Sequence, residues 1–197
     1  MKRTFFVFIA ILSLISCNKT RRIVSDIPIK TNVLGVELCE RMTFEQVAEV
    51  LAKNTNLYFM PVPMSQQGGG SVVYRLMPEG LNFQYGGLSW TYIDVNVTKD
   101  SEVCSISLVG SYESIENAKR QYDSAVSIFA KKYGKWNKVE GESESESIAY
   151  WTDDVNSVCV GYAESSTLNG ADRSFCELYY INIALSDKVE EENQQDI

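Results

Sequence analysis

The chain has 197 residues, of which 45% are hydrophobic and 22% charged, a composition typical of one ordinary globular domain. It contains no histidine, which excludes histidine-based catalytic triads, histidine-liganded metal sites and histidine pH switches. The formal net charge of −8 argues against nucleic acid as a partner.

The N-terminal segment is typical of a signal peptide. Lys2-Arg3 precedes the apolar stretch 4–16, which is shorter than the roughly 20 residues that span a bilayer. The run Leu14-Ile15-Ser16-Cys17 resembles the lipobox of bacterial lipoproteins. This resemblance implies cleavage after residue 16 and acylation of Cys17, including a palmitate-type chain. With Asn18 next, it also implies anchoring in the outer membrane, facing the periplasm or the cell surface.

The two ends of the mature chain differ in charge. Residues 17–32 are rich in Lys and Arg and lack periodicity, so we expect a lipidated tether beside the membrane, or simply a solvated linker. Residues 187–197 are strongly acidic and offer no apolar face, which predicts a disordered tail. Between them, residues 33–186 are long enough to form one globular domain.

Two helices are predicted. Thr43 and Gln46 form a capping box before an apolar stripe that ends near Asn54. A longer stripe runs from Ile115 to Tyr133, with lysines in its last turn and a glycine after it. Both stripes indicate core packing.

The rest of the domain reads as β-strands, because β-branched and aromatic residues alternate with turn residues. The predicted strands are Leu57–Met60, Ser71–Leu76, Leu81–Tyr85, Trp90–Thr98, Val103–Val109, Ser147–Thr152, Ser157–Ala163 and Phe175–Leu185. We therefore expect an α+β fold: an antiparallel sheet with two helices packed on one face.

The order helix-then-strands occurs twice, which suggests a tandem repeat with candidate halves 33–110 and 111–186. The tetrapeptides Val50-Leu51-Ala52-Lys53 and Ile128-Phe129-Ala130-Lys131 match locally in the two halves.

One hairpin register points to a candidate binding face. Pairing around residues 100–101 sets Val97 opposite Cys104, Val95 opposite Ile106 and Ile93 opposite Leu108, on one apolar side that the helices should cover. The other side then remains open for a protein or glycan partner, although its aromatic side chains could equally be packed in the core. The candidate binding residues are Trp90, Tyr92, Asp94 and Asn96, together with Tyr180 and Asn182 of the last strand.

Four cysteines remain after Cys17, in a compartment where disulfides form. A register that sets Cys159 opposite Cys176 matches the separation a disulfide needs, and makes one side of that hairpin apolar except for Glu177. Cys39–Cys104 then follows by elimination, and buried free thiols are the alternative.

No motif indicates a cofactor or a metal site, so we predict neither. Asp153-Asp154 beside Trp151 could suggest a carboxylate hydrolase of the cell envelope, but nothing in the sequence fixes a second acid at catalytic distance.

The helix entry resembles a known family. Gly35-Val36-Glu37-Leu38 followed by Met42-Thr43-Phe44-Glu45-Gln46-Val47 resembles the entry of the outer-membrane assembly lipoproteins of the SmpA/OmlA type and the related repeat of β-lactamase-inhibitor proteins. This resemblance implies a non-catalytic α+β module whose open sheet holds a protein partner. We keep two alternatives, an envelope hydrolase and a structural or surface-exposed antigenic lipoprotein.

Overall fold

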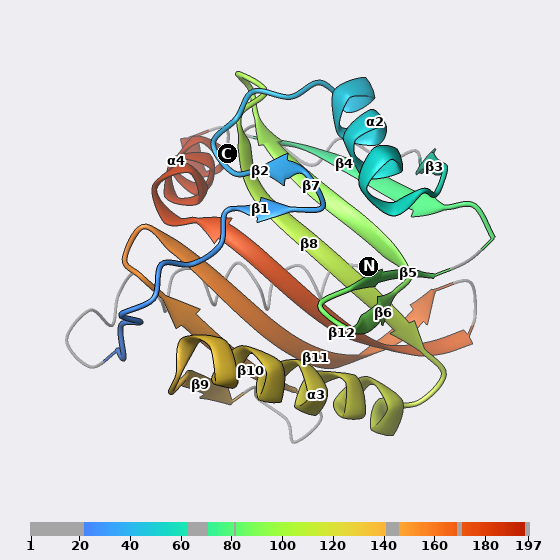
Figure 1. Cartoon of the computed structure of the whole chain (residues 1–197), viewed down its shortest axis with the longest axis vertical. Coiled ribbons are helices and arrows are strands. Elements are labelled where there is room, and N and C mark those ends of the chain that lie inside the picture. Colours follow the sequence, from blue (N-terminus) through green and yellow to red (C-terminus); the bar gives the residue numbers. More distant parts are fainter. Residues whose placement is uncertain (1–21, 63–70, 81, 141–145, 169–170, 196–197) are drawn as a thin grey trace.

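The fold is seen in a computed structural model that describes residues 22–62, 71–80, 82–140, 146–168 and 171–195. The predicted signal peptide and Cys17 lie outside these residues. An eight-stranded antiparallel sheet forms the body of the described chain (Figure 1). Its strands, in spatial order, are β3 (Phe59–Val62), β4 (Ser71–Pro78), β7 (Tyr92–Thr98), β8 (Val103–Tyr112), β12 (Ala171–Asn182), β11 (Asn156–Leu168), β10 (Ser147–Thr152) and β9 (Asn137–Glu140).

Two helices and two small hairpins cover one side of this sheet, which we call the helix side. Helices α2 (Phe44–Thr55) and α3 (Ile115–Tyr133) lie on that side, and the hairpins β1–β2 (Asn32–Val33 and Val36–Glu37) and β5–β6 (Phe83–Tyr85 and Leu88–Trp90) lie between them (Figure 1). Their apolar side chains join those of the sheet in one buried core. The predicted α+β class, with two helices on one face of an antiparallel sheet, is confirmed.

Both helices begin and end where the sequence predicts. The Thr43 hydroxyl accepts a hydrogen bond from the Gln46 backbone N–H at 3.4 Å, and the Gln46 side chain accepts one from the Thr43 N–H at 2.8 Å. Helix α3 is capped by the Ser114 side chain, and Gly134, with a φ of 82°, follows its last residue. Only glycine adopts that conformation without strain, so the chain leaves the helix there.

The order of a helix followed by four strands of the main sheet occurs twice along the chain. Helix α2 precedes β3, β4, β7 and β8, and helix α3 precedes β9, β10, β11 and β12. The last strands of the two sets, β8 and β12, pair with each other at the centre, so β3 and β9 form the two edges. The matching tetrapeptides 50–53 and 128–131 lie near the ends of α2 and α3.

The acidic C-terminal segment differs from the prediction. Residues 187–195 belong to a helix, α4 (Ile183–Gln195), and are not a disordered tail. The Asn182 side-chain oxygen accepts a hydrogen bond from the Leu185 N–H at 3.1 Å and so caps this helix. Ion pairs of 3.8 Å join Lys99 to Glu192 and Lys188 to Asp100, which tie the helix to the β7–β8 turn. The acidic composition of this segment alone does not predict the helix, because its ion-pair partners Lys99 and Asp100 lie far away along the chain.

Candidate functional site

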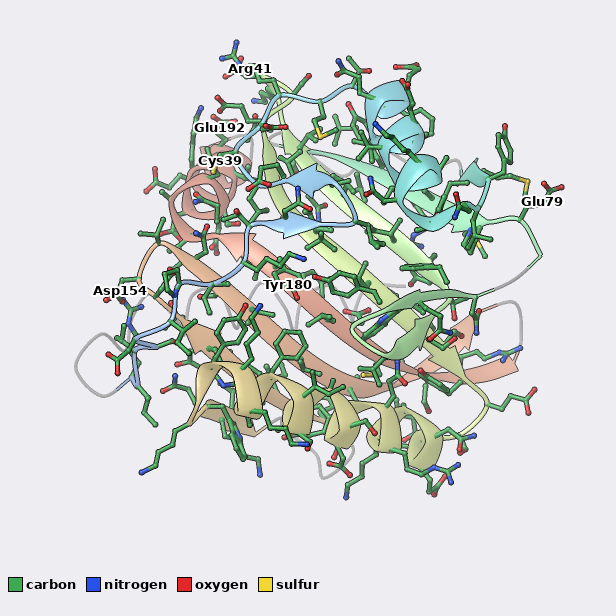
Figure 2. The ribbon with its side chains drawn as sticks, in the orientation of Figure 1. Cys39, Arg41, Glu79, Asp154, Tyr180 and Glu192 are labelled. Carbon is green, nitrogen blue, oxygen red and sulfur yellow. The ribbon has the colours of Figure 1, made fainter. Side chains whose placement is uncertain are left out.

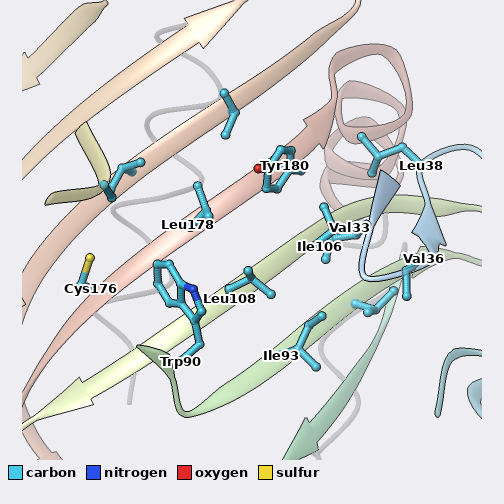
Figure 3. Packing of buried hydrophobic residues seen from close by; sticks show 14 of the residues in the cluster. Val33, Val36, Leu38, Trp90, Ile93, Ile106, Leu108, Cys176, Leu178 and Tyr180 are labelled. Atoms are coloured by element: carbon cyan, nitrogen blue, oxygen red, sulfur yellow. The ribbon is translucent and has the colours of Figure 1, made fainter. Parts of the chain in front are cut away.

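Two aromatic residues predicted on the open face lie in the core on the helix side. Trp90 has no exposed surface and Tyr180 is 1% exposed, and both lie among the aliphatic side chains of the core (Figure 3). The Trp90 indole donates a hydrogen bond to the Tyr85 carbonyl at 3.1 Å. The Tyr180 hydroxyl lies 3.1 Å from that of Tyr85. The prediction that these two rings form a binding surface is therefore wrong.

The physical reason is a break in the strand at Thr91. Trp90 ends β6, which pairs with β5, and Tyr92 begins β7, which pairs with β8. The two residues therefore belong to different ladders, and the alternation of sides does not continue through Thr91. Thr91 itself is fixed by its N–H, which donates to the Val109 carbonyl at 2.7 Å, and by its hydroxyl, which accepts from the Ser111 N–H.

Asn182 is also buried on the helix side. Its side chain donates to the Asn156 side-chain oxygen at 3.0 Å, and it caps α4. It therefore has a structural role, and it does not belong to the candidate binding face.

Three of the predicted residues do lie on the other side of the sheet, which we call the back face. The register pairs Tyr92 with Val109, Asp94 with Ser107 and Asn96 with Ser105, as the sequence predicts. The predicted pairing of Val97 with Cys104 is wrong, because a bulge sets Val97 opposite Val103.

A polar cluster crosses the back face over four neighbouring strands. The register aligns Arg75 of β4, Asp94 of β7, Ser107 of β8 and Tyr179 of β12 in one row. Arg75 donates two hydrogen bonds to Asp94 and lies over the Tyr92 ring, 4.3 Å from its centroid. We call the set Arg75, Tyr92, Asp94, Ser107, Glu177 and Tyr179 the back-face cluster.

Glu177 gives this cluster an excess of acid. It pairs with Val109, which in turn pairs with Tyr92, so it lies one row from the Arg75–Asp94 pair. Arg75 is the cluster's single cation and is already engaged by Asp94. Burial, with a smaller contribution from the Asp94 carboxylate, raises the pKa of Glu177 to about 7.

Three side-chain oxygens on the back face are buried without a hydrogen-bond partner among the described residues. They are Oγ of Ser107, Oγ of Ser157 and Oε2 of Glu177. Buried polar groups are paired in the great majority of proteins, because an unpaired one costs about 1 to 3 kcal/mol. Any of these oxygens that stays unpaired therefore destabilises the fold.

The half of the back face toward β9 is apolar. Ile148, Tyr150, Cys159 and Ile181 form a second buried cluster, with Val139 and Tyr179 packed against it. The back face thus combines a polar half over β4, β7, β8 and the Glu177–Tyr179 part of β12 with a buried apolar half over the rest of β12 and over β11, β10 and β9.

Sequence reasoning missed Arg75, Ser107, Glu177 and Tyr179 as site residues. One signal was available for Glu177, because it was the single charged residue on the apolar side of the predicted last hairpin. Arg75 is likewise the only charged residue within the predicted strand Ser71–Leu76. A lone charge in an otherwise apolar strand needs a partner, and here Arg75 has one on the next strand.

The predicted Cys159–Cys176 disulfide is also wrong. Cys159 pairs with Tyr179 and Cys176 pairs with Tyr162, so the true register differs from the predicted one by three residues. An odd shift moves a side chain to the opposite side of the sheet. Cys159 accordingly lies on the back face and Cys176 in the helix-side core, and both are free.

Cys39 and Cys104 are brought close together, although both are free thiols. The Cys39 N–H donates to the Val103 carbonyl at 2.8 Å, so Cys39 lies beside the residue that precedes Cys104. Cys39 has a φ of 67°, in the left-handed region, and the next residue, Glu40, accepts a hydrogen bond from the Val103 N–H at 2.8 Å. Burial raises the pKa of Cys104 to about 11, and the Cys39 thiol contributes to this rise.

The acid pair Asp153-Asp154 has structural roles. The Asp153 carboxylate accepts hydrogen bonds from the N–H groups of Ile29, Val155 and Asn156, and Asp154 forms an ion pair with Arg22. Trp151 beside them is 1% exposed, so it offers no face for stacking a sugar. Among the described residues, no group of three or more Cys, Asp or Glu side chains is arranged to hold a metal ion.

Comparison with protein-family models, with curated proteins and with solved structures finds no match for this chain. Within the described ranges, no helix is both long enough and apolar enough to cross a membrane.

Proposed function

We propose that the chain is a non-catalytic lipoprotein of the bacterial outer membrane that holds a protein partner on the back face of its sheet. The back-face cluster carries this proposal, because its members Tyr92, Glu177 and Tyr179 are partly exposed and place two aromatic rings beside an excess of acid.

The chemistry of the back face favours a protein over a glycan. Its polar half has an acid excess at Glu177, which suits a lysine or arginine of the partner. Tyr92 and Tyr179 are partly exposed in the back-face cluster, and tyrosine is enriched among the residues that dominate binding energy.

The test is site-specific photo-crosslinking in the intact bacterial envelope. A photoreactive phenylalanine in place of Tyr92 should give one discrete adduct with a second protein, and adding Glu177→Lys should abolish it. The matched control is the same substitution at Tyr58, which is 66% exposed beside the edge strand β3. If position 92 gives no adduct, or the same adducts as position 58, the back face is not the binding surface and the purely structural alternative gains support.

The lipid anchor has its own test. Cys17→Ala should leave the protein unprocessed and without acyl chains, as measured by the mass of the N-terminal peptide. Normal processing at residue 17 together with unchanged membrane association would contradict the lipoprotein assignment.

One observation favours a carboxylate hydrolase as a second candidate. Glu177, whose pKa is raised to about 7, lies near Asp94, which is paired with Arg75. A protonated and an ionised carboxyl group together are what acid–base hydrolysis needs. Both Asp94 oxygens are engaged by Arg75, however, which disfavours this role. Hydrolysis of an envelope glycan that is lost in both Glu177→Gln and Asp94→Asn would support the hydrolase instead.

A further inference from the structure

Five large apolar side chains are exposed at the place where the described chain begins. Ile23, Val24 and Ile27 are 43%, 44% and 47% exposed, Trp136 is 41% exposed and Val155 is 61% exposed. We call these five residues the apolar patch. Exposed apolar side chains that gather in one place mark an interaction surface, whereas scattered ones are ordinary.

Hydrogen bonds hold the members of this patch together. The Asn137 side chain accepts from the Ile23 N–H at 2.7 Å and donates to the Ile23 carbonyl at 2.8 Å, which places Ile23 beside the Trp136–Asn137 segment. The Ser25 N–H donates to the Thr152 carbonyl at 2.7 Å. Arg22 forms an ion pair with Asp154, the residue before Val155; Asp154 is labelled in Figure 2. Residues 22–27 are thereby fixed between the end of α3 and the β10–β11 turn.

Four lysines lie close in the chain to Trp136 of the apolar patch. Lys131 and Lys132 lie in the last turn of α3, and Lys135 and Lys138 lie on either side of Trp136–Asn137, all four exposed. The acids nearby are fewer: Asp26 is exposed, Asp154 is paired with Arg22, and the Asp153 carboxylate accepts three backbone hydrogen bonds. In a chain with a net charge of −8, this region is locally basic.

The length of the tether restricts what this patch can face. Five peptide units join Cys17 to Arg22, and an extended chain spans at most about 3.3–3.6 Å per residue, or about 17 Å here. If Cys17 carries acyl chains in the bilayer, the patch lies within that reach of the lipid headgroups.

We propose that the apolar patch and its lysines rest on the membrane, so that the domain is oriented on an anionic lipid surface. This inference rests on the proposed acylation of Cys17. Trp136 is the type of side chain that prefers the lipid–water interface, and lysines beside it attract anionic headgroups. Tyr58, Met60 and Val72 are also exposed, but they lie on or beside β3 and β4, at the end of the sheet opposite β9 and β10. They are exposed apolar residues outside the patch.

Tryptophan fluorescence tests the proposal directly. Trp90 has no exposed surface and Trp151 is 1% exposed, so Trp136 is the tryptophan that lipid can reach. The acylated full chain is placed in phosphatidylglycerol vesicles whose acyl chains carry bromine, a quencher of tryptophan emission. We expect a loss of emission relative to unbrominated vesicles, and no such loss in Trp136→Phe.

Charge reversal supplies the second arm. The double variant Lys131→Glu/Lys135→Glu should reduce the quenching in phosphatidylglycerol vesicles, whereas Lys53→Glu, an exposed lysine at the end of α2, should leave it unchanged. A protein that is acylated and floats with the vesicles, but whose Trp136 is not quenched, would overturn this inference and leave the lipid anchor standing. Lack of acyl chains on Cys17 would overturn both.

Discussion

Arg75 and Asp94 lie opposite each other on β4 and β7, and Arg75 donates two hydrogen bonds to the Asp94 carboxylate, from Nε at 2.7 Å and from Nη2 at 2.5 Å. The side chains are 25% and 13% exposed, so the pair is largely removed from water. The two hydrogen bonds hold both side chains in one orientation. Because Asp94 engages Arg75, the back-face cluster has no second cation to pair with Glu177.

Asp94→Asn is expected to destabilise the fold, because it leaves the Arg75 guanidinium without its counter-charge. We expect chemical denaturation to show a free energy of unfolding lower by about 2 kcal/mol. Breaking a fully buried pair costs about 3–5 kcal/mol, and the loss is smaller here because some solvent reaches the pair. The double variant Arg75→Met/Asp94→Leu should recover most of the loss. Arg41→Met is the control, since its 3.6 Å pair with Glu102 is mostly exposed and should contribute under about 1 kcal/mol. Equal losses in Asp94→Asn and Arg41→Met would contradict the buried pair.

Glu177 makes stability depend on pH. Its pKa is about 7 in the folded chain against an ordinary 4.5, so the folded state favours the protonated form. The stability that this group contributes is complete below about pH 4.5 and is lost as the pH rises through about 7. Glu177→Gln should therefore be as stable as the original chain at about pH 4.5 and more stable at about pH 8, by at most about 3 kcal/mol.

Thermal unfolding of both proteins across this pH range measures the difference. Glu79→Gln, at an exposed position after β4, is the control for removing a carboxylate. A difference between Glu177→Gln and the original chain that does not change with pH would show that Glu177 is not buried as described.

Trp90 and Tyr92 should respond very differently to truncation. Trp90→Ala empties a fully buried core position and is expected to cost about 3 to 5 kcal/mol. Tyr92→Ala removes a half-buried ring that lies under the Arg75 guanidinium, and we expect a clearly smaller loss of stability. Urea unfolding of the two variants measures this, and a larger loss for Tyr92→Ala would reverse the assignment of the two sides of the sheet.

The cysteines give a prediction about pairing. Mild oxidation of the reduced protein should join Cys39 to Cys104, because these residues lie beside each other across neighbouring chain segments. Cys159 and Cys176 should stay unbridged, since the sheet separates their side chains. Peptide mapping without reduction identifies the bridges, with Cys39→Ser as the control that should leave Cys104 free. A Cys159–Cys176 bridge would contradict the register of β11 and β12.

The sequence is most informative where local chemistry specifies the structure. The Thr43–Gln46 capping box, the two apolar stripes and Gly134 locate both helices within about a residue, because caps and periodicity depend on nearby positions. The β7–β8 register was predictable for the same reason: one side of that hairpin is apolar and the other polar, so only one pairing is consistent.

The β11–β12 register was not predictable, because both sides of these strands carry apolar residues. Val158 and Val160 lie on the helix side, yet Cys159 and Ile181 are buried on the back face, so alternation does not distinguish the two arrangements. This ambiguity placed Tyr180 and Asn182 on the wrong side of the sheet. Trp90 was misplaced for another reason, because at Thr91 the chain leaves one ladder for another without a turn residue that would indicate the change.

The contacts of the N-terminal segment determine when it can fold. Ile23 is held by Asn137, which comes 114 positions later, and the Ile29 N–H is held by Asp153, 124 positions later. A contact of such long range forms only after the intervening chain is in place. If the chain is exported with its N-terminus first, the segment beside the anchor emerges first and docks last, once the α3–β12 half has folded. A newly anchored molecule would therefore pass through a stage in which residues 22–29 are not yet docked, so that a longer connecting segment joins the folding domain to the membrane.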